Sequence, residues 1–323
     1  MPRPQISARI GIKRITQDIM TTLTHTDSTA HADTRTPDWA REALAVPSRS
    51  AHLDVDGCRI HYLSWGNPEL PPLVLVHGNG AHAEWWRFIA PFFIDRYHVI
   101  APDMGGMGDS GHCGRYERER YAEQTMAVAR AAAPGRAPIL VGHSMGGYVV
   151  MLAALKYKAD LAGLMMLDSP IEGPAVVPNP PAVRASRRNT VFPDLETAVQ
   201  RFRVVPEQPI LCDFYREHIA RHSVARIDDG WWWKFDPDAL GVKRPIPYAQ
   251  DLLDMPCPVA IFWGEKSMRV EPSAREYMHS VFEGRIPIVE IPRAGHHIML
   301  DTPLELITAL RAQLANWRAA PAR

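Results

Sequence analysis

The chain has 323 residues, of which 46% are hydrophobic, enough for one large α/β domain with an insertion or for two small domains. Its 36 basic and 36 acidic residues cancel, so the composition gives no sign of a nucleic-acid partner or of a polybasic membrane patch. No apolar run approaches the ~18 residues that span a bilayer, so we expect no membrane-spanning segment.

The cysteines and histidines show no spacing that is typical of a metal site. The four cysteines (Cys58, Cys113, Cys212 and Cys257) are scattered and form no CxxC motif. This pattern favours reduced thiols in a cytoplasmic protein. The histidines form neither H-x-H nor HExxH, so we expect no metal and no other cofactor.

The N-terminal segment differs in composition from the rest of the chain. We expect residues 1–50 to form an arm that is extended or partly disordered. Residues 1–19 are basic but lack the apolar stretch of a secretory signal. Their arginine and lysine content would suit a transit peptide, whereas a loose arm, or an upstream start with the functional start at Met20, is the simpler interpretation. Residues 21–39 are rich in Thr and Asp, which is typical of a linker.

From Leu53 onward, apolar strands alternate with helical stretches. A tight turn at Asp56-Gly57 predicts a β-hairpin. Strands alternating with helices predict a mostly parallel central sheet with helices on both faces. The predicted strands lie at residues 72–78, 97–103, 137–144 and 161–168, and the predicted helices at 83–93, 117–133 and 145–157.

The alternation stops after Pro170, where the sequence becomes rich in proline. Two helical stretches, near residues 194–202 and 212–222, and the aromatic run Trp231–Phe235 follow. Strands at residues 259–263 and 286–291 and a last helix at 303–317 resume the pattern. We therefore expect an α/β core of residues 51–170 and 256–323, interrupted by a cap insertion at residues 171–255.

The sequence "GHSMGG" (residues 142–147) marks a candidate nucleophile. It lies between a predicted strand and a predicted helix, which is the context that a G-x-S-x-G nucleophile elbow requires. The turn is so tight that its flanking positions must lack bulk, and Gly142 and Gly146 meet that need. Ser144 would then project from the carboxyl edge of the sheet, beside a helix N-terminus that favours negative charge.

With this elbow, residues 53–317 resemble the α/β-hydrolase-fold proteins of the serine esterase and lipase kind. The resemblance implies a triad in the order Ser, acid, His, with His296 of "RAGHHIML" as the general base and His297 as the alternative. It also implies an oxyanion hole formed by the backbone amides of Asn79, after His77-Gly78, and Met145.

The position of the acid departs from the family pattern. Where the family has G-x-x-D, this chain has Gly264-Glu265-Lys266-Ser267. Asp168 ends the strand after the nucleophile's helix, 24 residues beyond Ser144, and is the favoured acid, with Ser267 as a possible hydrogen-bond partner. Glu265, a serine–histidine dyad and another acid remain alternatives, since an aspartate before Ser-Pro also suits a simple turn.

These residues predict a serine hydrolase that cleaves an ester or lactone of a small, fairly apolar molecule. Asn79 also suits a haloalkane dehalogenase, but that class and the epoxide hydrolases need an aspartate nucleophile, so Ser144 argues against both. Cleavage of a C–C bond, perhydrolysis and a non-enzymatic ligand receptor are the alternatives. Trp86 and Trp231 are candidate pocket residues, and the sequence leaves the oligomeric state open, a homodimer included.

Overall fold

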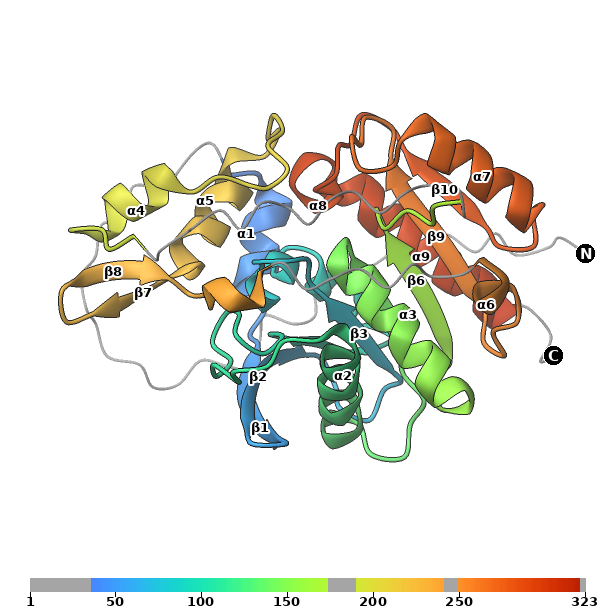
Figure 1. Cartoon of the computed structure of the whole chain (residues 1–323), viewed down its shortest axis with the longest axis horizontal. Coiled ribbons are helices and arrows are strands. Elements are labelled where there is room, and N and C mark those ends of the chain that lie inside the picture. The colour runs from blue at the N-terminus through green and yellow to red at the C-terminus, as the bar shows by residue number, and fades with distance from the viewer. Residues whose placement is uncertain (1–35, 174–189, 241–248, 320–323) are drawn as a thin grey trace, which may run out of the picture. The chain divides into compact units, whose positions relative to one another are not determined.

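The computed structural model describes residues 36–173, 190–240 and 249–319 (Figure 1). Most of the expected N-terminal arm, residues 1–35, and the proline-rich stretch after Gly173 lie outside the described residues. The described residues all belong to the compact unit that begins at Thr36.

Eight strands form one sheet in the order β1-β2-β4-β3-β5-β6-β9-β10. The hairpin strands β1 (Arg49–Val55) and β2 (Cys58–Trp65) are antiparallel, β2 is antiparallel to β4 (His98–Pro102), and all remaining neighbours are parallel. The predicted hairpin and the mostly parallel sheet are therefore confirmed. The remaining strands are β3 (Pro72–Val76), β5 (Ile139–His143), β6 (Gly163–Leu167), β9 (Val259–Gly264) and β10 (Ile288–Ile291).

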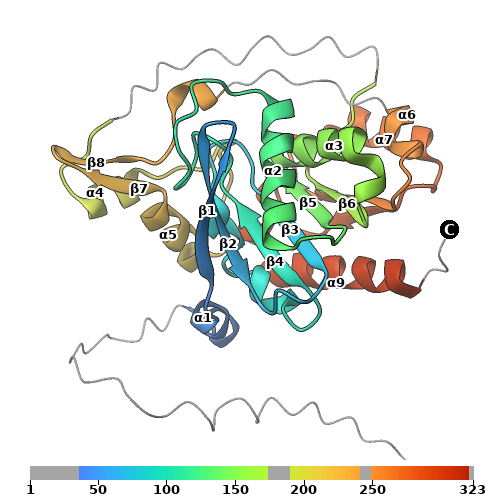
Figure 2. The same cartoon turned by 90° about the horizontal axis from the view of Figure 1, so that it is seen from below.

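Helices cover both faces of this sheet, as predicted. Because successive residues of a strand point to opposite faces, Leu73 and Leu75 of β3 join one apolar cluster and Val74 and Val76 join the other. The first cluster includes α9 (Pro303–Ala319), and the second includes α2 (Arg118–Ala132), α3 (Met145–Tyr157) and α7 (Pro272–Phe282). Figure 2 shows α9 on one side of the sheet and α2 and α3 on the other. The short elements are η3 (Lys158–Asp160), α6 (Ala249–Leu253) and α8 (Ile298–Asp301).

The expected helix at residues 83–93 is wrong. The chain forms two 3₁₀-helices there, η1 (Ala83–Trp86) and η2 (Ala90–Phe93). Pro91 lies in the first turn of η2, where its missing N–H does no harm, but the same residue inside one continuous helix would remove a hydrogen bond.

The expectation that residues 1–50 form an extended or partly disordered arm is wrong from residue 38 onward. Helix α1 (Asp38–Ala45) precedes β1, and its Trp39 ring contacts the rings of Phe88, Phe92 and Phe214. Burial of this aromatic side chain explains why a segment of linker-like composition is ordered here.

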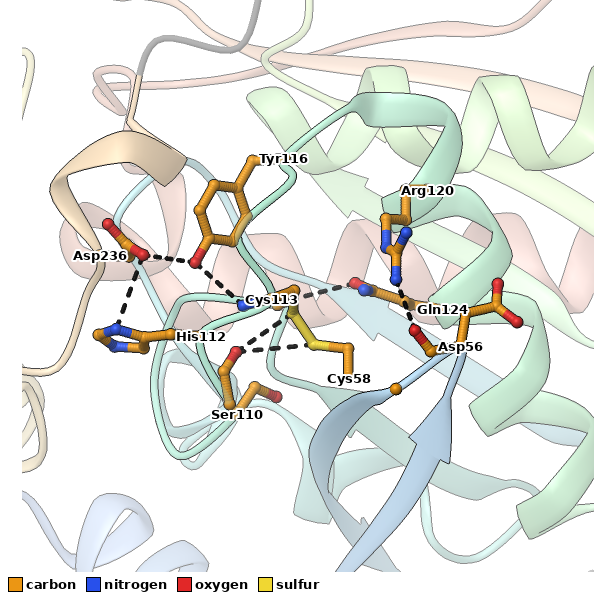
Figure 3. Close-up of a disulfide and its surroundings, with 12 residues drawn as sticks. Asp56, Cys58, Ser110, His112, Cys113, Tyr116, Arg120, Gln124 and Asp236 are labelled. Carbon is orange, nitrogen blue, oxygen red and sulfur yellow. Dashed lines mark hydrogen bonds and ion pairs between the residues drawn. A yellow bond between two sulfur atoms is a disulfide. The ribbon is translucent and has the colours of Figure 1, made fainter.

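The expectation of four reduced thiols is wrong for two of the cysteines. Cys58, at the start of β2, and Cys113 form a disulfide, whereas Cys212 and Cys257 are free (Figure 3). The loop that carries Cys113 runs along β2, where the Gly111 amide donates to the carbonyl of Arg59. The two cysteines are 55 residues apart in sequence, so their spacing carried no sign of this contact. The thiol argument for a cytoplasmic location therefore falls away.

The elements between β6 and β9 include several that lie outside the eight-stranded sheet. We call residues 190–240 the inserted segment. It contains α4 (Leu195–Arg201), α5 (Asp213–His222), the hairpin β7 (Val224–Ile227) and β8 (Gly230–Trp233), and η4 (Pro237–Ala239). The tryptophan run thus forms a strand, and α6, within the expected cap range 171–255, packs instead with the core cluster of α7.

The inserted segment is attached to the glycine-rich loop that follows β4. The amide of Gly108 donates to the carbonyl of Lys234, and the amide of Asp236 donates to the carbonyl of Gly106. Nearby, the Tyr116 hydroxyl donates to Oδ2 of Asp236 at 2.5 Å (Figure 3). Among the described helices, none is both long and apolar enough to cross a bilayer.

Candidate active site

The turn between β5 and α3 places Ser144 in a strained backbone conformation. Its φ of 54° and ψ of −118° are rarely adopted by a residue with a side chain. A Cβ atom at Gly142 would lie 2.2 Å from the carbonyl oxygen of Gly146, and a Cβ at Gly146 would lie 2.5 Å from that of His77. The glycines of the motif are therefore required by backbone crowding on both sides of the serine.

The structure brings Ser144, His296 and Asp168 together from three different loops. Nε2 of His296 lies 3.0 Å from Oγ of Ser144, and Nδ1 of His296 lies 2.6 Å from Oδ2 of Asp168. The histidine follows β10 and the aspartate follows β6, so the carboxyl ends of parallel strands supply all three groups. His296 is 3% and Asp168 1% exposed, whereas Ser144 is partly open to solvent.

Asp168 is held by donors from the loop after β9. Its Oδ1 accepts the amide of Gly264 at 2.9 Å, and its Oδ2 accepts the hydroxyl of Ser267 at 2.6 Å. Ser267, which stands where the family usually has its acid, thus lies against the carboxylate of Asp168. Glu265 is exposed and accepts the amide of Arg293 at 2.7 Å, so the structure does not bring it to the histidine.

The two expected oxyanion-hole residues flank the serine. Met145 begins α3, directly after Ser144. Asn79 follows Gly78, a position where a Cβ atom would lie 3.3 Å from Cβ of Ser144. Within the described part of the chain, neither the Asn79 amide nor the Met145 amide donates to another residue. His77 shapes this loop, since Nδ1 donates to the carbonyl of Gly78 and Nε2 accepts the amide of Met104.

Two further histidines lie beside His296: His143, to which sequence reasoning assigned no role, and His297, which was the alternative candidate for the base. Nε2 of His143 donates to the carbonyl of His296 at 2.8 Å and so fixes the backbone of that residue. His297 is buried, its two ring nitrogens find no hydrogen-bond partner among the described residues, and its ring lies 5.4 Å from that of Trp85. In the sequence, only its place inside the "GHS" motif indicated that His143 lies near the serine.

Two buried histidines near the site should make the fold sensitive to acid. Burial, reinforced by the charge of His296, lowers the pKa of His297 to about 3 from an ordinary value of 6.5. Burial also lowers the pKa of His82 to about 3, although the Asp103 carboxylate opposes this. Between these values the unfolded chain binds more protons than the folded one, so stability rises with pH and is lost as pH falls.

We expect each of these histidines to contribute a slope of about 1.4 kcal/mol per pH unit to the free energy of unfolding within that window. Denaturant unfolding between pH 7 and pH 4 measures this slope. The free energy of unfolding should depend less steeply on pH in His297→Gln than in the unchanged protein. His279→Gln, at an exposed position on α7, is the matched control. An unaltered slope in His297→Gln would contradict the assignment.

The two tryptophans expected in the substrate pocket differ in their burial. Trp86 is 0% exposed within the core, so none of its surface borders solvent. Trp231 of β8 exchanges backbone hydrogen bonds with Phe192 and packs in a small cluster with Ala198 and Val224. Neither residue contacts the serine, histidine or aspartate described above.

A serine at a strand–helix elbow, with a histidine and an aspartate from later strand ends, defines a hydrolase site on a mostly parallel α/β sheet. A family model described as the alpha/beta hydrolase family matches residues 73–310, and the chain belongs to this family. The resemblance and fold expected from the sequence are thereby confirmed.

Relatives within the family catalyse several kinds of hydrolysis. The chain is 24% identical over 310 residues to epoxide hydrolase 3 of Xenopus tropicalis, covering 84% of this chain and 80% of that protein. It is 24% identical to an sn-1-specific diacylglycerol lipase of Mus musculus, covering 84% and 93%, and 30% identical over 183 residues to the pimeloyl-[acyl-carrier protein] methyl ester esterase of Vibrio atlanticus, covering 57% and 65%.

Solved structures share the fold. E-2-(acetamidomethylene)succinate hydrolase aligns with a TM-score of 0.70 at 21% identity, covering 83% of this chain and 100% of that one. The thioesterase domain from the curacin biosynthetic pathway aligns with a TM-score of 0.69 at 22% identity, covering 82% and 99%. At these identities the likeness concerns the fold alone.

Proposed function

We propose that the protein is a serine hydrolase that cleaves a carboxylic ester or lactone of a small, fairly apolar molecule through an acyl-enzyme. The observation that carries this proposal is the continuous chain of contacts from Oγ of Ser144 through His296 to Asp168. The relatives named as a lipase and a methyl ester esterase support the same reaction class.

In the proposed reaction, Nε2 of His296 takes the proton of Ser144 as Oγ attacks the carbonyl carbon. Asp168 keeps the imidazole in the tautomer with hydrogen on Nδ1 and stabilises its positive charge. The amides of Asn79 and Met145 hold the oxyanion. His296 then protonates the leaving alcohol and activates a water molecule, which releases the acid.

Epoxide hydrolysis fits this site poorly, despite the relative with that name. Attack of Ser144 on an epoxide carbon would form an ether, which has no carbonyl for water to attack, so the enzyme would remain alkylated. Perhydrolysis, C–C bond cleavage and non-enzymatic ligand binding remain alternatives that substrate profiling separates.

We further propose that the insertion at residues 171–255 acts as a cap over the substrate. Oε1 of Gln208 accepts the amide of His297 at 3.0 Å, and the Leu240 side chain lies beside Gly80. The inserted segment thus contacts both the loop of the base and the loop of the oxyanion hole. A cleft beneath such a cap would exclude water and favour apolar acyl groups.

A fluorophosphonate probe tests the nucleophile directly. We expect stoichiometric labelling of the unchanged protein, complete loss of labelling in Ser144→Ala, and normal labelling in the control Ser280→Ala on α7. Profiling with p-nitrophenyl esters and lactones should show turnover by the unchanged protein. Ser144→Ala, which is not labelled, should show none. Labelling that persists in Ser144→Ala would refute the proposal, and a folded protein that is neither labelled nor active would favour the receptor alternative.

A further inference from the structure

A cavity of about 250 Å³ lies away from the serine site. The β-hairpin, η1 and the C-terminal end of α5 enclose it, and no member of the Ser144–His296–Asp168 contacts lines it. Most of the residues that line it are of polar or charged types, and they include Ser50, His61, Glu84, Arg87, Asp109 and His222. A cavity with this lining suits a small polar or charged ligand.

Glu84 and His222, which line the cavity, belong to a group of three residues with the composition of a zinc site. His218 and His222 lie four residues apart on α5, so both side chains project from one face of the helix. Glu84 of η1 faces them, and the possible ligand atoms of all three residues lie within 4.8 Å of one another. Two histidines and a carboxylate are a ligand set that Zn²⁺ commonly takes. Sequence reasoning missed this H-x-x-x-H spacing.

One ring nitrogen of His222 makes a hydrogen bond of the kind that metal-binding histidines make. Nδ1 of His222 donates to the backbone carbonyl of His218 at 2.8 Å, so in the neutral ring Nε2 is the nitrogen that offers a lone pair. Metal-binding histidines in general donate their second ring N–H in this way, which fixes both tautomer and orientation.

His218 and Glu84 share a hydrogen bond, and a metal ion bound by both side chains would replace the proton of that bond. Nε2 of His218 lies 2.9 Å from Oε2 of Glu84. The side chains of His218 and Glu84 are 14% and 15% exposed, so this contact is largely shielded from solvent.

Two other groups of histidines and carboxylates come equally close together, and most of their ring nitrogens have hydrogen-bond partners, those of His297 excepted. In the group at the serine site, Nε2 of His143 donates to a carbonyl and both nitrogens of His296 have partners. In the group at Asp103, Nδ1 of His61 pairs with that carboxylate and Nε2 pairs with Ser50. Among these three groups, the one on α5 combines two histidines on one helix face with a carboxylate, whereas the others hold three histidines or a single one.

We infer that Glu84, His218 and His222 bind a Zn²⁺ ion, with water from the cavity in the fourth position. Bond lengths of about 2.0–2.2 Å put the ligand atoms of tetrahedral zinc about 3.3 Å apart, so the side chains must draw together slightly. Arg87, which donates to both oxygens of Glu84, would keep its bond to Oε1, and its charge lowers the affinity for the cation.

The ion would join two parts of the molecule that are distant in sequence. Glu84 follows the Asn79 loop of the core, whereas both histidines belong to the inserted segment. Zn²⁺ would therefore brace this segment against the core. The inference does not depend on the reaction at Ser144, since the site is defined by binding alone.

Titration of the full-length, tag-free protein with Zn²⁺ tests the inference, read by calorimetry and by competition with a chromophoric chelator. We expect one saturable ion per chain and a rise in Tm on addition of Zn²⁺. His222→Gln should weaken binding by at least about 100-fold and remove the rise in Tm. His279→Gln, at an exposed position on α7, should bind as the unchanged protein does. Co²⁺ should give the visible absorption bands of tetrahedral coordination, which His218→Gln removes.

Three results would overturn the inference. The first is the absence of saturable binding in the folded protein. The second is unchanged binding in both His222→Gln and His218→Gln, with circular dichroism showing that each variant is folded. The third is binding that disappears in His297→Gln instead, which would place the ion at the serine site. Fluorophosphonate labelling of the same samples reports separately on Ser144.

Discussion

Replacing Asp168 by Asn should lower kcat by about 10⁴-fold, whereas Glu265→Gln should leave it unchanged. An asparagine would still accept the amide of Gly264, but its NH₂ group would face Nδ1 of His296. The imidazole would then adopt the tautomer with hydrogen on Nε2, which cannot take the proton of Ser144.

Steady-state kinetics with one activated ester measure both variants, and circular dichroism and Tm establish that they are folded. KM should change little, because Asp168 is buried behind the histidine and does not contact the substrate. Loss of kcat in Glu265→Gln with normal activity in Asp168→Asn would exclude the acid proposed above. Ser267→Ala removes one hydrogen bond to the carboxylate and should cost far less than Asp168→Asn.

Reduction of the Cys58–Cys113 disulfide should lower the free energy of unfolding by about 4 kcal/mol. The bond closes a loop with a sequence separation of 55, and the entropy that the unfolded chain gains when the loop is opened grows with that length. The pair Cys58→Ser/Cys113→Ser should reproduce the loss, whereas Cys212→Ser, at a free cysteine, should not.

Thiol titration and denaturant unfolding check this result. Without reductant, the denatured protein should show two reactive thiols, from the free cysteines, and after reduction it should show four. Four thiols in the untreated protein would mean that the pair is not bonded. Equal stability with and without reductant would show that the bond contributes nothing to the folded state.

Much of this architecture could be predicted because the relevant signals are local. Uninterrupted apolar runs identify the strands that are buried on both faces, as in β3 and β5. A G-x-S-x-G sequence between a strand and a helix identifies Ser144, since only that turn needs both glycines. Ser267 stands at the usual position of the acid, so the acid was expected at the end of a neighbouring strand, where Asp168 lies. Neighbouring parallel strands end at the same edge of the sheet.

The features that were missed depend on contacts between distant segments. Trp39 is ordered by rings more than forty residues away, so nothing near it in the sequence predicts α1. The Cys58–Cys113 bond exists because a loop returns along β2. Trp86 was expected at the pocket because it is aromatic, but residue type alone does not separate a core position from a lining position.

The hydrogen bonds that attach the inserted segment to the glycine-rich loop do not depend on side chains. At Gly106 and Gly108 the bonds join main chain to main chain, so substitution of the neighbouring side chains leaves them intact. On the side facing His297 the amide of Cys212 donates to the carbonyl of Leu300, and the side chain of Gln208 adds contacts to the His297 amide and to Asp301. Substitution of Gln208 should therefore remove only part of the contacts on this side, while the main-chain bonds persist.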